Sequence, residues 1–146
     1  MPRIERSAQV VWDGNLARGN GRISGDTGTF TDLPYTLASR IGNPDGKTSP
    51  EELLAAAHAG CFTTSLAGEL VHDGTPPGHL EVHCTIVMDE VEGEGHQIVG
   101  SRVSVRIEVE GASDETLAAA VERADAGCPF STLLRKAGAE VTVSRS

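Results

Sequence analysis

The order of the elements that the sequence predicts indicates an α+β fold, with antiparallel sheets packed around one long central helix. Residues 4–41 have the pattern of short strands, residues 49–72 that of one long apolar helix, and residues 80–109 that of two further strands. Two short helices and a closing strand follow. Because strands and helices come in runs instead of alternating, this order favours an α+β fold over a doubly wound βαβ sheet. We expect the 146 residues to form a single domain, residues 1–146.

The composition excludes several classes of function. The formal net charge is −9 and the chain has no run of Lys or Arg, so neither nucleic acid nor an anionic membrane is an expected partner. No stretch approaches the ~18 to 20 apolar residues of a membrane span, and the first seven residues carry charges where a signal peptide needs an apolar run. We therefore expect a cytoplasmic protein.

The first strands form a predicted antiparallel meander that carries two arginines. Residues 4–12 are rich in β-branched side chains and end at a turn of Asp, Gly and Asn. Arg18 precedes a Gly-Asn-Gly turn, and Arg40 lies near the end of the third strand region. Either arginine could be a solvated surface residue. The further short strands are predicted at residues 22–24, 29–30 and 35–41.

The long helix has the best-marked start in the chain. Ser49 is a good N-cap, Pro50 suits the first helical position, and Glu52 completes a capping box. The pattern predicts an apolar stripe with Cys61 near the middle of the helix. The stripe comprises Leu53, Ala57, Cys61, Thr64 and Gly68, widened by Leu54, His58, Phe62, Ser65 and Leu66.

The second half of the chain predicts two strands, two helices and a last strand. Residues 80–88 and 103–109 both show the period of two of half-buried strands, which makes Cys84 a predicted core thiol. A helix is expected from Asp114 to a C-cap at Gly127. Residues 131–136 predict a short third helix, and residues 140–144 a last strand.

The three cysteines are the main candidates for chemistry. Cys61, Cys84 and Cys128 are odd in number and none lies in a Cys-x-x-Cys unit, so a structural disulfide framework is not predicted. In a reducing compartment a functional thiol is reactive or a metal ligand, although a buried inert thiol is commoner. Cys61 lies too far inside its helix for the helix dipole to ionise it. Cys128 precedes Pro129 at the start of a short helix, where backbone N–H groups would favour a thiolate.

Peroxide reduction would suit two such thiols. A thiolate can attack the O–O bond and become a sulfenic acid, which a second thiol then converts to a disulfide. An arginine suits the task of keeping the thiolate charged, and a carboxylate such as Glu51 could hold that arginine. Glu51 lies ten residues before Cys61, or ~15 Å along a straight helix. We therefore expect a site that is assembled at a homodimer interface.

At these residues the sequence resembles the OsmC/Ohr family of thiol-dependent hydroperoxide reductases, and its OsmC branch in particular. The segment from Ser49 to Phe62, SPEELLAAAHAGCF, is similar to the family signature around the first cysteine. The segment from Ala126 to Ser131, AGCPFS, is similar to the motif around the second cysteine. Trp12, Arg18-Gly19 and residues 38–41 also fit, so the resemblance covers essentially the whole chain.

The resemblance implies an intertwined homodimer that reduces organic hydroperoxides, and hydrogen peroxide less well, to alcohols. Cys61 would be the peroxidatic and Cys128 the resolving cysteine. The OsmC branch implies Arg40 as the activating arginine with Glu51 as its partner, whereas the Ohr branch would point to Arg18. An external dithiol would reduce the disulfide, a lipoylated protein in the Ohr branch, and no metal or flavin cofactor is implied.

Two alternatives have different chemistry. A dimer of this kind could bind an apolar ligand in its interface groove, with the cysteines incidental. Cys61, Cys128 and His58 could instead bind zinc, but His58 is more simply a packing or hydrogen-bonding residue of the helix.

Overall fold

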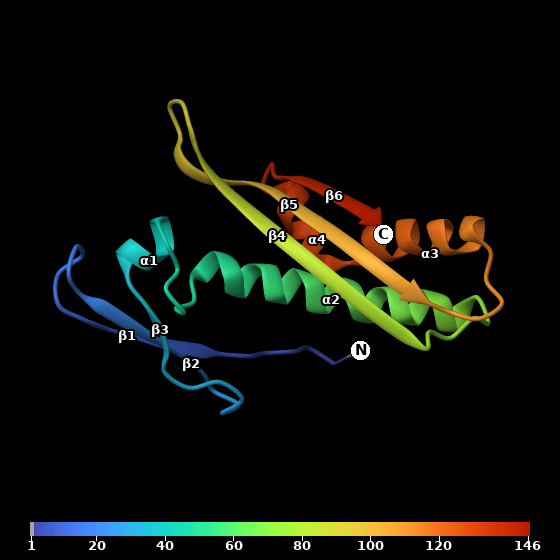
Figure 1. Ribbon diagram of the computed structural model, residues 1–146, viewed down its shortest axis with the longest axis horizontal. Helices are drawn as coiled ribbons and strands as arrows, with labels where there is room; N and C mark the ends of the chain where they lie inside the picture. The colour runs from blue at the N-terminus through green and yellow to red at the C-terminus, as the bar shows by residue number, and fades with distance from the viewer. Residues whose placement is uncertain (1) are drawn as a thin grey trace. The chain divides into compact units, whose positions relative to one another are not determined.

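The structure is a computed structural model that describes residues 2–146 (Figure 1). The chain divides into two compact units, Met1–Pro50 and Glu51–Ser146, each of which we describe by itself. Over residues 2–146, two small sheets and four helices make up the α+β fold that the sequence predicts.

The N-terminal unit holds an antiparallel meander as predicted, but residues 29–30, expected as a strand, form a bend. Strands β1 (Ala8–Asp13), β2 (Asn20–Gly25) and β3 (Leu33–Tyr35) pair in that order. The prediction of a strand over residues 35–41 is wrong beyond Tyr35, because helix α1 (Leu37–Ile41) follows.

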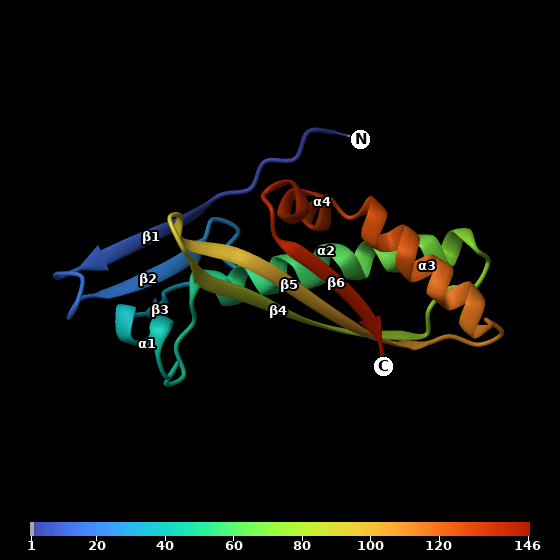
Figure 2. The same cartoon turned by 90° about the horizontal axis from the view of Figure 1, so that it is seen from above.

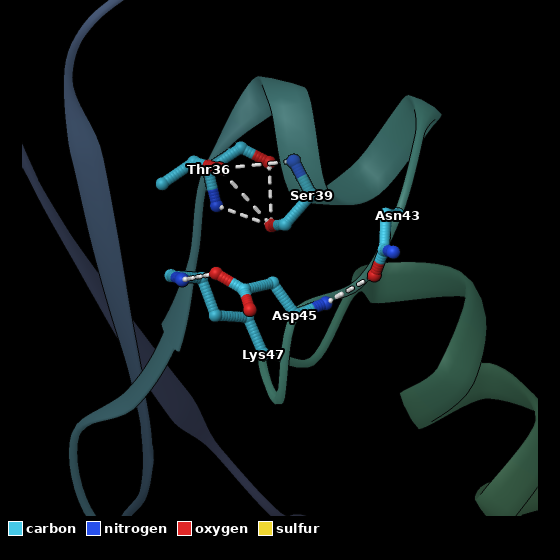
Figure 3. Close-up of polar contacts among 5 residues, drawn as sticks. All are labelled: Thr36, Ser39, Asn43, Asp45 and Lys47. Atoms are coloured by element: carbon cyan, nitrogen blue, oxygen red, sulfur yellow. Dashed lines mark hydrogen bonds and ion pairs between the residues drawn. The ribbon is translucent and has the colours of Figure 1, made fainter.

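A capping box explains why α1 forms (Figure 3). The Thr36 side chain accepts a hydrogen bond from the Ser39 N–H at 3.0 Å, and the Ser39 hydroxyl accepts one from the Thr36 N–H at 3.0 Å. These reciprocal bonds satisfy amides that a short helix otherwise leaves without partners. The box puts Arg40 in the last turn of α1 instead of on a strand.

The C-terminal unit is built on helix α2 (Pro50–His72), which begins and ends where the sequence predicts. Its buried face is rotated from the predicted stripe, however. The side chains that are fully buried are those of His58, Phe62, Leu66 and Leu70. The large side chains determine which face packs, because they bury the most apolar surface, whereas alanine and glycine lie at the margins.

The second sheet contains β4 (His79–Val91), β5 (Gly95–Glu108) and β6 (Glu140–Arg145), in that order. The first two strands form a long antiparallel hairpin. The expectation of purely antiparallel sheets is wrong for β6, which pairs parallel to β5 (Figure 2). Two helices connect β5 to β6, and a crossover of this kind is what a parallel pair requires.

Those helices complete one hydrophobic core. Helix α3 (Asp114–Gly127) and helix α4 (Pro129–Lys136) are separated by Cys128 alone. Buried side chains of α2, β5 and α3 form a cluster with Cys128, and Cys84 packs against it as predicted. The cluster comprises Phe62, Leu66, Leu70, Val103, Val105, Leu117, Ala120, Ala124 and Cys128. Within residues 2–146, no helix is long and apolar enough to cross a membrane.

Candidate thiol site

The structure brings Cys61 and Cys128 together, although they are far apart in the sequence. Cys61 lies in the middle of α2 with its side chain partly exposed, and Cys128 links α3 to α4 with an exposed fraction of 0%. Cys61 packs against the buried cluster that contains Cys128, and the Cys128 thiol lies close enough to affect the pKa of Cys61. The pair therefore needs no large rearrangement of the chain to meet.

The surroundings of Cys61 favour the neutral thiol. Burial raises the pKa of this thiol, and the hydrogen bond with the Cys128 thiol raises it further. The backbone N–H of Phe130 has the opposite effect and lowers the Cys61 pKa. The groups that act on Cys61 here belong to the unit Glu51–Ser146, and none of them is positively charged. Ionising Cys61 at neutral pH therefore calls for a cation.

The first backbone N–H of α4 acts on the Cys61 thiol. This corrects the expectation that the backbone N–H groups at this helix start would favour a thiolate at Cys128. Cys128 is the N-cap as predicted, but its side chain makes no capping hydrogen bond. Pro129 has no N–H, so Phe130 carries the first backbone donor of the helix, and this N–H lowers the pKa of the Cys61 thiol. The amide dipoles at this terminus thus act on the thiol of another helix.

A buried polar network adjoins the thiol pair. His58 is fully buried, and its Nδ1 lies 2.7 Å from the Ser101 hydroxyl while its Nε2 lies 2.7 Å from the Ser131 hydroxyl. The Cys84 sulfur lies 3.2 Å from the same Ser101 hydroxyl. Burial lowers the pKa of His58, so the ring is neutral near pH 7 and each nitrogen has a hydroxyl partner.

The network bears on the zinc alternative. Both ring nitrogens of His58 are already hydrogen-bonded to hydroxyls, so neither is directed at a metal ion. Within residues 2–146, no group of three His, Cys, Asp or Glu side chains has the arrangement of a metal site. The interpretation of His58 as a hydrogen-bonding helix residue is confirmed.

Sequence reasoning missed the partners of His58. Ser131 belongs to the second-cysteine motif, and its spacing from Cys128 was a usable signal. Ser101 had no such signal, because a single serine in a strand is usually a surface residue. Both serines have an exposed fraction of 0%.

The predicted arginines lie in the N-terminal unit. Arg40 lines a cavity of about 310 Å³ together with Trp12, Leu16, Tyr35 and Leu37. Arg18 lies in the turn after β1, where its backbone N–H donates to the Asn15 side chain at 2.8 Å. The cavity combines a guanidinium with an apolar lining, which are the two features that an organic hydroperoxide would use.

Glu51 lies in the first turn of α2, on the same helix as Cys61. The helix is unbroken from Pro50 to His72, so the ten residues between the two side chains span ~15 Å. Glu51 and Cys61 of one chain are therefore not neighbours.

Known proteins resemble this chain in sequence and in fold. Residues 42–144 match the family model of the OsmC-like proteins. Peroxiredoxin OsmC of Escherichia coli (strain K12) is 32% identical over 140 residues, which cover 96% of this chain and 94% of that protein. The organic hydroperoxide resistance protein of Xanthomonas axonopodis pv. citri is 32% identical over 106 residues, covering 71% of this chain and 72% of that protein.

Solved structures agree on the fold. The organic hydroperoxide resistance protein OhrB of Bacillus subtilis superposes with a TM-score of 0.75 at 23% identity, covering 96% of this chain and 98% of its own. An organic hydroperoxide resistance protein from Elizabethkingia anophelis gives a TM-score of 0.77 at 22% identity, covering 100% of this chain and 99% of its own.

Proposed function

Because the chain belongs to the OsmC/Ohr family, we propose that it is a cysteine-based peroxidase that reduces organic hydroperoxides, and hydrogen peroxide less well. The contact between the thiols of Cys61 and Cys128 is the observation that carries this proposal. A partly exposed thiol beside a buried one suits a reaction in which the first meets the oxidant and the second resolves the product.

The reaction has three balanced steps. The Cys61 thiolate attacks one oxygen of the hydroperoxide, the O–O bond breaks, and Cys61 becomes a sulfenic acid. The alkoxide that leaves takes up a proton from solvent, equal to the one that the thiol released, and becomes the alcohol. The Cys128 thiol then condenses with the sulfenic acid, which forms the disulfide and releases water. An external dithiol, such as a lipoylated protein, reduces the disulfide and is itself oxidised. Such reductants are available in the cytoplasm, the compartment that the sequence predicts.

Arg40 is the proposed activator of Cys61. Its guanidinium stays charged at any working pH and can stabilise both the thiolate and the oxygen that leaves. Glu51 would hold this guanidinium in place. Arg40 is preferred to Arg18 because it lines the apolar cavity of the N-terminal unit.

The active form is proposed to be a homodimer that takes residues of one site from both subunits. The support is the length of α2, which separates Glu51 from Cys61 within one chain. If Glu51 and Arg40 act on a thiol, that thiol belongs to the other subunit.

Thiol counting after one equivalent of cumene hydroperoxide tests the function. We expect the loss of one thiol pair per chain, with mass spectrometry placing the new disulfide between Cys61 and Cys128. Cys61→Ser is expected to abolish turnover. Cys128→Ser is expected to permit one attack and then stop with Cys61 as a sulfenic or more oxidised acid.

The competing function, binding of an apolar ligand in the interface groove, predicts a different result. Hydroperoxide would then leave the number of thiols unchanged. Equal loss of the first attack in both cysteine variants would contradict the roles given to Cys61 and Cys128.

A further inference from the structure

We propose that His58 is a positioning residue, which holds the start of α4 against Cys61 through its hydrogen bond with Ser131. This inference rests on the proposed function and adds a residue to it. The start of α4 carries both the resolving thiol of Cys128 and the Phe130 N–H that reaches Cys61. A contact that holds the start of α4 in place therefore also sets the geometry of the Cys61–Cys128 pair.

The two helices are joined by a pair of contacts with matching spacing. His58 precedes Cys61 by three residues on α2, and Ser131 follows Cys128 by three residues on α4. Residues three apart lie on the same face of a helix, about one turn from each other. The His58–Ser131 bond therefore lies one turn away from the Cys61–Cys128 contact, between the same two helices.

The imidazole is itself held on its other side. Ser101 of β5 bonds Nδ1 at 2.7 Å while Ser131 bonds Nε2 at 2.7 Å. The ring and both serines have an exposed fraction of 0%, so water cannot replace either bond without opening the core. The ring is thus bonded to both the sheet and α4, and the bond with Ser131 is the one that reaches the α4 terminus.

A disulfide is sensitive to such positioning. Its sulfurs must approach to ~2.05 Å with the Cα atoms ~4.4 to 6.8 Å apart. A displacement of about 1 Å in a reacting pair can slow a reaction by about a hundredfold. Release of the α4 terminus should therefore slow the resolving step much more than an equal loss of stability elsewhere would.

Two serine variants provide a matched test. Ser131→Ala removes the bond from His58 to α4, and Ser101→Ala removes a bond of equal length from the same ring to the sheet. In each full-length variant we would measure the urea midpoint, the pH profile of Cys61 alkylation by iodoacetamide, and the rate of disulfide formation. The rate of disulfide formation is measured by rapid quenching after one equivalent of cumene hydroperoxide is added.

We expect similar urea midpoints for the two variants but different thiol chemistry. Ser131→Ala should slow disulfide formation at least about tenfold and move the alkylation profile of Cys61 to higher pH, since the Phe130 N–H is displaced. Ser101→Ala should change the rate by less than about threefold. Equal effects in both variants, or no effect in Ser131→Ala, would overturn the proposal.

A substitution of His58 itself provides an independent test. His58→Leu should resemble Ser131→Ala, and the double variant should be no slower than the slower single variant, because both act through one bond. Additive slowing would contradict this.

The outcome is separable from that of the proposed function. A wild-type protein that forms no disulfide would refute the peroxidase cycle. The alkylation profiles would still decide whether His58 positions α4, because they need no peroxide.

Discussion

Burial governs the reactivity of Cys61 at the scale of single residues. The pKa of this thiol is raised by burial and by the hydrogen bond with Cys128, and the Phe130 N–H offsets only part of that rise. A thiol in such surroundings is protonated at neutral pH and reacts slowly with peroxides. The proposed cycle therefore depends on a cation near the sulfur.

Arg40→Ala tests that dependence. We expect the rate of peroxide attack at pH 7 to fall by at least about tenfold, and then to rise about tenfold per pH unit as the thiol with its raised pKa ionises. Stopped-flow measurements between pH 6 and 9 would check this, with Arg18→Ala as the control. A flat response in Arg40→Ala and a loss in Arg18→Ala would transfer the role to Arg18.

His58 makes a second prediction at this scale, for stability. Burial lowers the pKa of His58, Asp125 opposes the shift, and Arg135 adds to it. Because the folded-state pKa lies below the unfolded one of ~6.5, the unfolded chain binds the extra proton as the pH falls below that value. The neutral ring therefore stabilises the fold fully above pH ~6.5, and this contribution declines at lower pH.

Urea unfolding between pH 5 and 7.5 measures this effect. The free energy of unfolding should fall more steeply with decreasing pH in the wild type than in His58→Leu, by at most about 1.4 kcal/mol per pH unit. Parallel curves for the two proteins would show that folding does not shift the pKa of His58.

At the scale of elements, the capping box of α1 is the feature on which Arg40 depends. Thr36→Ala removes the side chain that accepts the Ser39 N–H, and loss of an N-cap costs about 0.5–2 kcal/mol. We expect amides 37–41 to exchange faster with deuterium and peroxide reduction to slow. Thr27→Ala is a suitable control, because that exposed hydroxyl bonds only within its own turn to Thr29. If both changes slow peroxide reduction equally, the activity does not depend on α1.

At the scale of the whole molecule, the proposed homodimer makes a prediction for mixed subunits. Arg40→Ala and Cys61→Ser should each be nearly inactive, but coexpressed chains should regain about a quarter of the wild-type activity, since half of the dimers would carry one intact site. Peroxidase assays on the unfractionated mixture of coexpressed chains would measure the recovery.

The matched control uses the two cysteine variants. Cys61 and Cys128 meet within one chain, so Cys61→Ser mixed with Cys128→Ser should recover no turnover. If Arg40→Ala and Cys61→Ser also fail to complement each other, both residues act within one subunit.

Local sequence determined the elements whose signals lie within a few residues. Pro50 and the capping pattern around it predict the start of α2, and alternating apolar residues predict β4 and β5. The residues themselves made Cys61 and Cys128 the candidates, and two motifs were enough to predict the family and, with it, the role expected of each thiol. The prediction of a strand over residues 35–41 was wrong beyond Tyr35, because the Thr36–Ser39 capping box starts a helix there.

Tertiary structure alone decided the contacts between distant segments. The parallel pairing of β6 with β5, the direction of the Phe130 N–H and the burial of Ser101 beside His58 all join residues that no local pattern relates. Each depends on how the helices and the sheet pack, because packing selects which polar groups lose water and must find partners. The sequence thus determined which side chains are available for chemistry, and the packing decided which of them meet.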